Sequence, residues 1–185
     1  MNEIEVKAKL KNKEKVLENL KSMGAQFGDT KYQKDTAFWP NDLKNTEKLH
    51  PLGRNFMRIR EQEKGGIKKV IFTLKQPQTN QTDCIEHEIE INEKDIPELK
   101  SIILMLGYYE YVTIEKNRTT AKLKDVEICI DDVTNLGSYI ELEKFAPADQ
   151  AEIIQKELYS MLESFGITKE DFVYDGYDIL VKNAR

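Results

Sequence analysis

The sequence predicts an α+β fold with eight antiparallel strands and three helices. Apolar and polar residues alternate with period two through most of the 185 residues, which is typical of half-buried strands. Three other segments carry apolar residues at helical spacing, and each stops at a glycine. Gly65-Gly66 adds a hairpin turn between two of the alternating segments. We therefore expect a meander of strands that can close on itself, with helices against it.

The individual elements follow from these two periods. The strands are expected near residues 2–9, 31–39, 55–63, 67–76, 84–92, 109–118, 124–132 and 138–144. The helices are expected at about 12–23, 93–106 and 147–165. The last of these begins at Pro147 and ends before Gly166, the usual order of helix boundary residues.

The composition excludes several classes of protein. With 28 Lys and Arg against 33 Asp and Glu, the net charge is −5, which disfavours a general nucleic-acid binder. The first residues, MNEIEVKAKLK, have no apolar core for secretion, so we expect a cytoplasmic protein. The longest aliphatic run is also far too short to span a membrane. Cys84 and Cys129 are far apart and are expected to be free thiols.

Charged residues recur at every second position of most predicted strands, so they share one face of each strand. For a single strand the simplest interpretation is a face exposed to water. Here the opposite, apolar faces need cover, which three amphipathic helices can supply from outside a closed sheet. The charged faces would then line an internal channel. Its basic residues would be Lys7, Arg58, Arg60, Lys75, Lys116 and Arg118, and its acidic residues Glu3, Glu5, Glu86, Glu88, Asp131, Glu141 and Glu143.

Such a channel has the residue types needed for a polyphosphate and a divalent cation. Buried charges need partners of opposite sign, and arginine binds phosphate through two parallel hydrogen bonds. Clustered carboxylates suit Mg²⁺ or Mn²⁺, which prefer oxygen ligands. Neither a GxxxxGK[ST] nor a GxGxxG motif is present, so a phosphate cradle at a helix N-terminus is not expected.

Several of these residues also form a series of short motifs in a recognisable order. Glu3-Ile-Glu5-Val-Lys7 matches the ExExK signature of the CYTH superfamily, the triphosphate tunnel metalloenzymes, and stands at the N-terminus as in that family. The motifs that follow resemble those of the family in the same order: Arg58-Ile-Arg60, Phe72-Thr-Leu-Lys75, Glu86-His-Glu88, Lys116-Asn-Arg118, Ile130-Asp131-Asp132-Val133, Leu136-Gly137 and Glu141-Leu-Glu143. The resemblance covers about residues 2–144.

The resemblance implies one CYTH-like domain over residues 1–185, a closed eight-stranded antiparallel barrel with helices packed outside. Its tunnel strands would lie in about 2–144, and a C-terminal helix and tail in 147–185. The family implies phosphate binding by Lys7, Arg58, Arg60, Lys75, Lys116 and Arg118. It implies Mg²⁺ or Mn²⁺ held or supported by Glu3, Glu5, Asp131, Glu141 and Glu143. Glu5, Lys75 and Asp131 are the expected catalytic residues, whereas Glu86 and Glu88 have no definite task.

Two reactions are compatible with this resemblance. Class IV adenylyl cyclases of the family convert ATP to cyclic AMP and pyrophosphate, whereas its triphosphatases hydrolyse thiamine triphosphate or inorganic tripolyphosphate. We favour the cyclase because His50-Pro51-Leu-Gly53-Arg54 and the Leu136-Gly137 turn resemble that branch and the length fits it; the tail near Tyr174 to Leu180 also loosely resembles the end of that branch. A non-catalytic binder of polyphosphates is a third hypothesis. The sequence leaves open whether the chain forms a homodimer, and whether Trp39, Phe38 or Tyr32 packs in the core or stacks on a purine.

Overall fold

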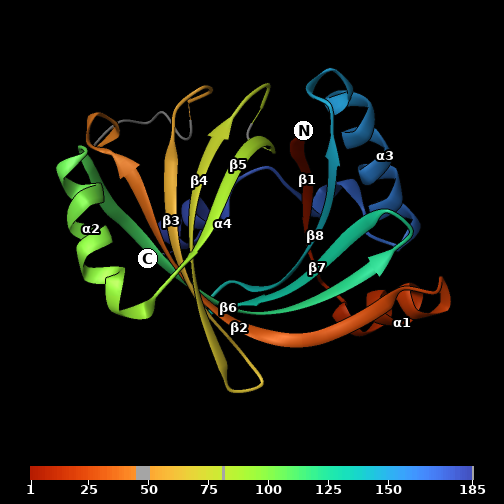
Figure 1. The fold of residues 1–185 in the computed structure, drawn as a ribbon. Helices are drawn as coiled ribbons and strands as arrows, with labels where there is room; N and C mark the ends of the chain where they lie inside the picture. Colours follow the sequence, from red (N-terminus) through yellow and green to blue (C-terminus); the bar gives the residue numbers. More distant parts are fainter. Residues whose placement is uncertain (45–50, 81, 185) are drawn as a thin grey trace.

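The described part of the chain, residues 1–44, 51–80 and 82–184 of a computed structural model, forms a closed antiparallel β-barrel with helices on its outside (Figure 1). The barrel strands are β1 (Asn2–Lys9), β2 (Gln26–Pro40), β3 (Phe56–Lys64), β4 (Ile67–Pro77), β5 (Asp83–Ile91), β6 (Tyr108–Leu123), β7 (Val126–Val133) and β8 (Gly137–Ala146). The helices are α1 (Lys13–Ser22), α2 (Ile96–Met105), α3 (Ala151–Ser164) and α4 (Tyr177–Asn183). The predicted α+β class and the closed eight-stranded barrel are confirmed.

The order of the strands differs from a simple meander. Around the barrel it is β5-β4-β3-β2-β6-β7-β8-β1, and β1 pairs again with β5 to close the circle. The closing contact is short, with Glu3 opposite Cys84 and Ile4 opposite Asp83. Two meanders, β2 to β5 and β6 to β8, are therefore joined through β2–β6 pairing and through β1. The helices α1 and α2 carry the chain between non-adjacent strands, which local periodicity does not reveal.

Strands β2 and β6 are longer than predicted because they bend along the barrel wall. Their pairing shifts register between Phe27 and Thr30 and again between Ala37 and Phe38. Gly28 stands at the first shift, where an added Cβ would lie only 3.3 Å from the Thr120 hydroxyl oxygen. The irregularity interrupts the alternation that defines a strand in sequence, so the first part of β2 was not expected.

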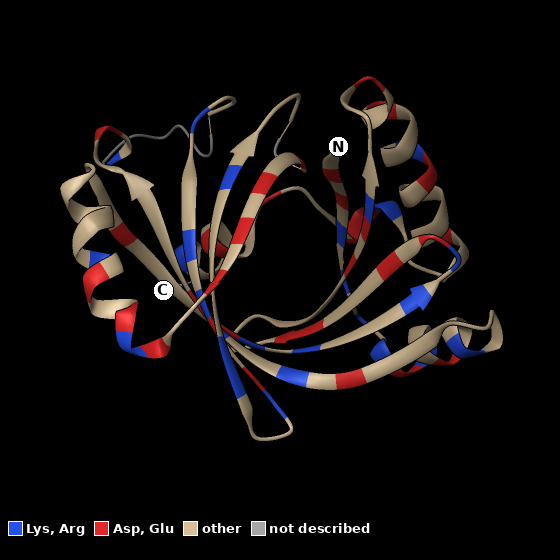
Figure 2. Cartoon of the chain, in the orientation of Figure 1, with Lys and Arg blue, Asp and Glu red and all other residues tan. Residues whose placement is uncertain are grey.

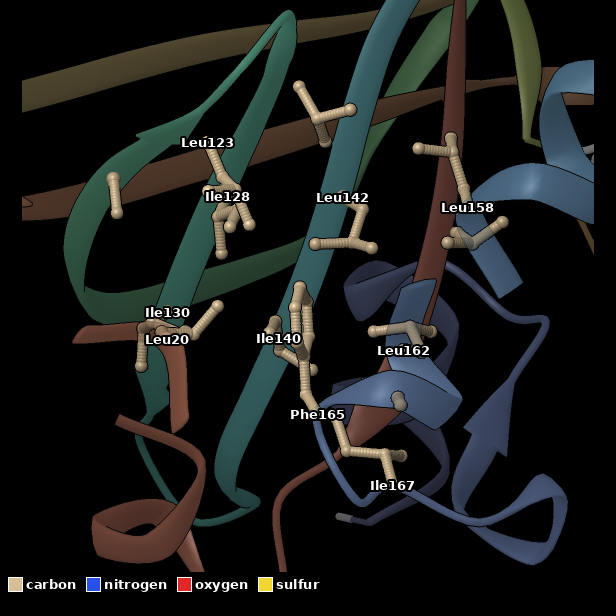
Figure 3. Packing of buried hydrophobic residues seen from close by; sticks show 14 of the residues in the cluster. Leu20, Leu123, Ile128, Ile130, Ile140, Leu142, Leu158, Leu162, Phe165 and Ile167 are labelled. Carbon is tan, nitrogen blue, oxygen red and sulfur yellow. The ribbon is translucent and has the colours of Figure 1, made fainter. Parts of the chain in front are cut away.

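Most of the apolar core lies outside the barrel rather than within it. In Figure 3, residues of β7 and β8 pack against α1 and α3, with Leu20, Leu142, Leu158, Leu162 and Phe165 in contact in one cluster. A second cluster joins Ile103 of α2 to Phe38, Ile59 and Val70 on the outer face of β2, β3 and β4. The helices thus cover the apolar faces of the strands, as the sequence predicted, and the other strand faces point inward.

A C-terminal tail completes the barrel wall. Its short strand β9 (Phe172–Val173) pairs with β1 at Lys7 and Ala8, beyond the point where β1 contacts β5. Helix α4 then packs against β2 and β6, and lies behind β3 and β4 in Figure 1. Neither element was predicted. None of the helices in the described ranges is long and apolar enough to span a membrane.

Candidate active site

A cavity of about 420 Å³ occupies the barrel interior, and the charged residues predicted to face inward form much of its wall. Figure 2 shows that Lys and Arg (blue) and Asp and Glu (red) recur along the strands of the barrel. The cavity-lining members of the predicted set are Glu3, Glu5, Lys7, Arg58, Arg60, Lys75, Glu86, Glu88, Lys116, Arg118, Glu141 and Glu143. Strand pairing brings them together across the wall; for example, Glu5 lies opposite Glu143. Successive inward positions of neighbouring strands therefore build one polar site.

Three carboxylates from β1 and β8 form an acidic cluster at one side of this cavity. Glu3, Glu5 and Glu143 can each offer an oxygen such that the three atoms lie within 4.8 Å of one another. Burial, with the negative charge of neighbouring carboxylates, raises the pKa of Glu3 to about 8 and that of Glu143 to about 7. A hard divalent cation would relieve this repulsion, and oxygen donors are the ligands it prefers. The donor set therefore fits Mg²⁺ or Mn²⁺.

Two arginines of β3 face the cavity from the opposite direction. Asp35 of β2 accepts hydrogen bonds from Arg60 Nε at 2.7 Å and Nη2 at 2.8 Å, which fixes the guanidinium. Arg58 donates from Nη2 to Thr73 Oγ1 at 3.1 Å and to Glu88 at 3.0 Å. The buried Arg58 Nε has no hydrogen-bond partner among the described residues. An anion in the cavity can satisfy such a donor.

Asp131 contacts two of the basic residues that line the cavity, Lys116 and Arg118. It is fully buried, is not among the described residues that line the cavity, and accepts hydrogen bonds from Lys116 Nζ at 3.0 Å and Arg118 Nε at 2.7 Å. Arg118 also contacts Glu141 and approaches Glu143 at 3.4 Å. Asp131 stays a predicted metal ligand and catalytic residue, although its carboxylate is already bonded to both of these basic groups. It is placed to orient Lys116 and Arg118.

The remaining basic residues are also held by carboxylates. Lys7 Nζ lies 3.1 Å from both Glu5 and Glu141, and these charges raise the pKa of Lys7 despite its burial. Lys75 contacts Glu86, which favours its charged form in the same way. Glu141 is shared between Lys7 and Arg118, so it is less available to a cation than the Glu3, Glu5 and Glu143 cluster. Glu90, next along β5, instead pairs with Lys69 outside the cavity.

Several cavity residues escaped the sequence interpretation. Lys31 and Asp35 line the cavity from β2, and Tyr174 to Asp178 line it from the tail. The alternation of Lys31, Gln33 and Asp35 was visible in the sequence and could have identified the inner face of β2. The tail residues lie between a strand of two residues and the first turn of a short helix, and neither element gives a clear periodic signal.

The three aromatic residues considered for purine stacking have different surroundings. Phe38 is in the outer core, and Tyr32 is exposed and donates a hydrogen bond to Glu115. Trp39 lines the cavity, but it stacks on Tyr111 with the ring centroids 3.9 Å apart. His50 of the motif before β3 lies outside the described residues.

The comparisons with known proteins agree with this architecture. The model of the CYTH domain matches residues 1–177. The chain belongs to the CYTH family. A "Putative adenylate cyclase" of Methanocaldococcus jannaschii is 31% identical over 180 residues, which is 96% of this chain and 97% of that protein. The solved structure of the PH1819 protein of Pyrococcus horikoshii has a TM-score of 0.81 at 24% identity and covers 99% of both chains.

A third similar protein is a solved structure with a different activity in its description. A structure from Hippeastrum, described as an adenylyl cyclase-like protein with a dominant triphosphatase activity, has a TM-score of 0.64 at 17% identity. It covers 100% of this chain and 96% of its own. At 17% identity for the Hippeastrum structure and 24% for the Pyrococcus structure, the likeness shows the fold alone. The membership of the chain in the CYTH family rests on the domain match and on the Methanocaldococcus relative.

Proposed function

We propose that this protein is a divalent-metal-dependent adenylate cyclase that converts ATP to cyclic AMP and pyrophosphate inside the barrel. The observation that carries the proposal is that fixed basic groups and the Glu3, Glu5 and Glu143 cluster face one cavity. This is the charge distribution that a triphosphate with its cation needs. The name of the Methanocaldococcus relative supports the cyclase reaction.

The side chains divide into two groups by task. Arg58, Arg60, Lys7, Lys116 and Arg118 neutralise the phosphate oxygens and hold the chain in one orientation, since their own partners already fix them. Lys75, which contacts Glu86 and acts electrostatically on Glu3 of the acidic cluster, binds the phosphate nearest the reacting atoms. Glu3, Glu5 and Glu143 hold the cation. The cation, when bound, supplies charge neutralisation at phosphate oxygens and activation of the attacking hydroxyl.

In the proposed reaction the ribose 3′-oxygen forms a bond to the α-phosphorus. The bond from that phosphorus to the bridging oxygen of the β-phosphate breaks, pyrophosphate leaves with that electron pair, and the hydroxyl proton is released. The base would lie beside Phe145 and Tyr174, aromatic residues of the cavity wall that are 62% and 64% exposed. Their exposed rings can stack on a purine.

Hydrolysis of a triphosphate is the second candidate, and two observations favour it. The Hippeastrum structure carries a dominant triphosphatase activity on the same fold. In addition, Trp39 already stacks on Tyr111, so this aromatic residue of the inner wall offers little surface to a base. Water would then form a bond to the terminal phosphorus, the bond from that phosphorus to the bridging oxygen would break, and the diphosphate would leave with that electron pair as orthophosphate forms. Thiamine triphosphate or inorganic tripolyphosphate would be the substrate, and the charged wall would neutralise its phosphate oxygens equally well.

The products separate these reactions. The protein is incubated with ATP, thiamine triphosphate or tripolyphosphate and Mg²⁺ or Mn²⁺, and products are resolved by ion-exchange chromatography. Cyclic AMP with equimolar pyrophosphate is the expected result, and orthophosphate as the main product would overturn the cyclase assignment in favour of hydrolysis. Tight binding without turnover of any compound would identify a binder. Glu5→Gln should abolish turnover, whereas Glu90→Gln, outside the cavity on β5, should leave it unchanged. Phe145→Ala should impair ATP turnover alone.

A further inference from the structure

The segment before α4 is held against the cavity from two sides. Lys7 Nζ of β1 donates a hydrogen bond to the Asp175 carbonyl oxygen at 3.3 Å. Trp39 Nε1 of β2 donates to Asp178 Oδ2 at 3.0 Å. The preceding residues pair with β1, and Ile179 is buried against the barrel. Tyr177 therefore stands at a fixed place in the cavity wall, although the tail that carries it is short.

The Tyr177 side chain combines close packing with an unused polar atom. It is 8% exposed and lines the cavity. Two lysines lie over its ring, with Lys7 Nζ of β1 at 4.5 Å and Lys116 Nζ of β6 at 4.6 Å from the ring centroid. Tyr139 packs edge-on at 5.5 Å between ring centroids. The buried Tyr177 hydroxyl has no hydrogen-bond partner in the described part of the chain.

Packing alone does not require this hydroxyl. A phenylalanine would make the same ring contacts with Tyr139 and the two lysines, without an unpaired polar atom. Burial and the negative charges of Glu141 and Asp131 hold the Tyr177 pKa well above its usual value, so the phenol is neutral and can donate. Lys7 and Lys116 are hydrogen-bond donors only, whereas the phosphate oxygens that they would bind are acceptors.

We propose that the Tyr177 hydroxyl donates a hydrogen bond to a phosphate oxygen of the triphosphate that Lys7 and Lys116 bind. This inference rests on the proposed function as far as triphosphate binding, and it holds for either the cyclase or the hydrolase. The tail is then part of the binding site and contributes a neutral donor among charged ones. A hydrogen bond from this rigid ring selects the position of one phosphate along the cavity.

The test is a binding measurement with an imido analogue of tripolyphosphate, in which nitrogen replaces the bridging oxygens. Because nitrogen replaces the bridging oxygens, this compound resists hydrolysis at those positions. It also has no ribose that could cyclise. Isothermal titration calorimetry is done in Mg²⁺ on the wild type, Tyr177→Phe, Tyr139→Phe and Lys7→Gln. Tyr177→Phe keeps the ring, and loss of a hydrogen bond to a charged acceptor should weaken binding by about tenfold or more. Tyr139→Phe is the matched control, because Tyr139 touches Tyr177 but does not line the cavity.

Each result has one interpretation. A tenfold loss in Tyr177→Phe, with Tyr139→Phe unchanged and the melting temperature of Tyr177→Phe equal to or above that of the wild type, supports the inference. Wild-type affinity in Tyr177→Phe, while Lys7→Gln binds more weakly, overturns this inference and leaves the proposed function standing. Absence of binding by the wild type overturns the proposed function and this inference with it. An equal loss in both phenylalanine variants overturns the specific role of Tyr177.

Discussion

Manganese should stabilise this protein strongly at pH 8 and only slightly at pH 6, because protons and the cation compete for the same carboxylates. The pKa values of Glu3 and Glu143 are raised to about 8 and about 7. For an acid with a raised pKa in the folded state, the stability contribution is greatest below the ordinary pKa near 4.5 and falls as pH rises through the folded-state pKa. Without metal, these two groups therefore make the folded protein less stable as the pH rises from 6 to 8. The cation opposes this loss because it binds the ionised carboxylates.

The size of the effect follows from these two pKa values. At pH 6 about one Glu143 in ten and one Glu3 in a hundred are ionised, against most of Glu143 and about half of Glu3 at pH 8. A site that needs both carboxylates ionised should weaken by at least about a hundredfold. With Mn²⁺ at about 100 times its pH 8 Kd, the stabilisation of about 2.7 kcal/mol at pH 8 falls to about 0.4 kcal/mol at pH 6.

Thermal unfolding followed by circular dichroism measures this difference. For a chain of this length, Mn²⁺ should raise the Tm by about 5 to 10 °C at pH 8 and by about 1 °C at pH 6. A Glu3→Gln/Glu143→Gln double variant should lose the response at both pH values, and Glu90→Gln should keep it. Equal Tm shifts at pH 6 and pH 8 in the wild type would refute the reasoning, as would an undiminished shift in the double variant.

Two further predictions concern the cavity and the core. Lys75→Gln should raise the KM for the triphosphate by about ten- to a hundredfold, because it removes a charge-assisted contact of about 1.5–3 kcal/mol. Steady-state kinetics at saturating Mn²⁺ measures this change, and an unchanged KM in a folded variant contradicts the role of Lys75. Leu162→Ala should lower the free energy of unfolding by about 3 kcal/mol, because Leu162 is 0% exposed, whereas Ile153→Ala on the same helix, 60% exposed, should cost less than about 1 kcal/mol. Urea titrations compare the two, and similar losses would show that α3 does not cover the core as described.

The inward faces of the strands could be predicted because side-chain direction alternates with fixed period. Glu3, Glu5 and Lys7 had to share a face once β1 was recognised, and the same held for Arg58 with Arg60. Alternation does not report depth, however. Asp131 shares the parity of the inward-facing residues of β7, but it is fully buried, is not among the described residues that line the cavity, and is bonded to Lys116 and Arg118.

Pairing between distant segments was not available from the sequence. The contact of β1 with β5 rests on two residue pairs, and the contact of β1 with β9 on two more, so neither leaves a local pattern. The place of Tyr177 depends on both the β9 contact and the Trp39–Asp178 hydrogen bond. The part of the site that comes from the tail therefore required the three-dimensional structure.

The hydrogen bond from Lys7 to the Asp175 carbonyl joins residues that are 168 positions apart. Contacts that span nearly a whole chain close the largest loops, and they form late because their entropic cost is paid before they contribute enthalpy. Docking of the tail is thus expected to be a final event in maturation. A polypeptide that ends before Phe172 is expected to form most of its barrel but to lack the part of the cavity wall that the tail supplies, which makes intact residues 172–185 a sensitive requirement for recombinant preparations.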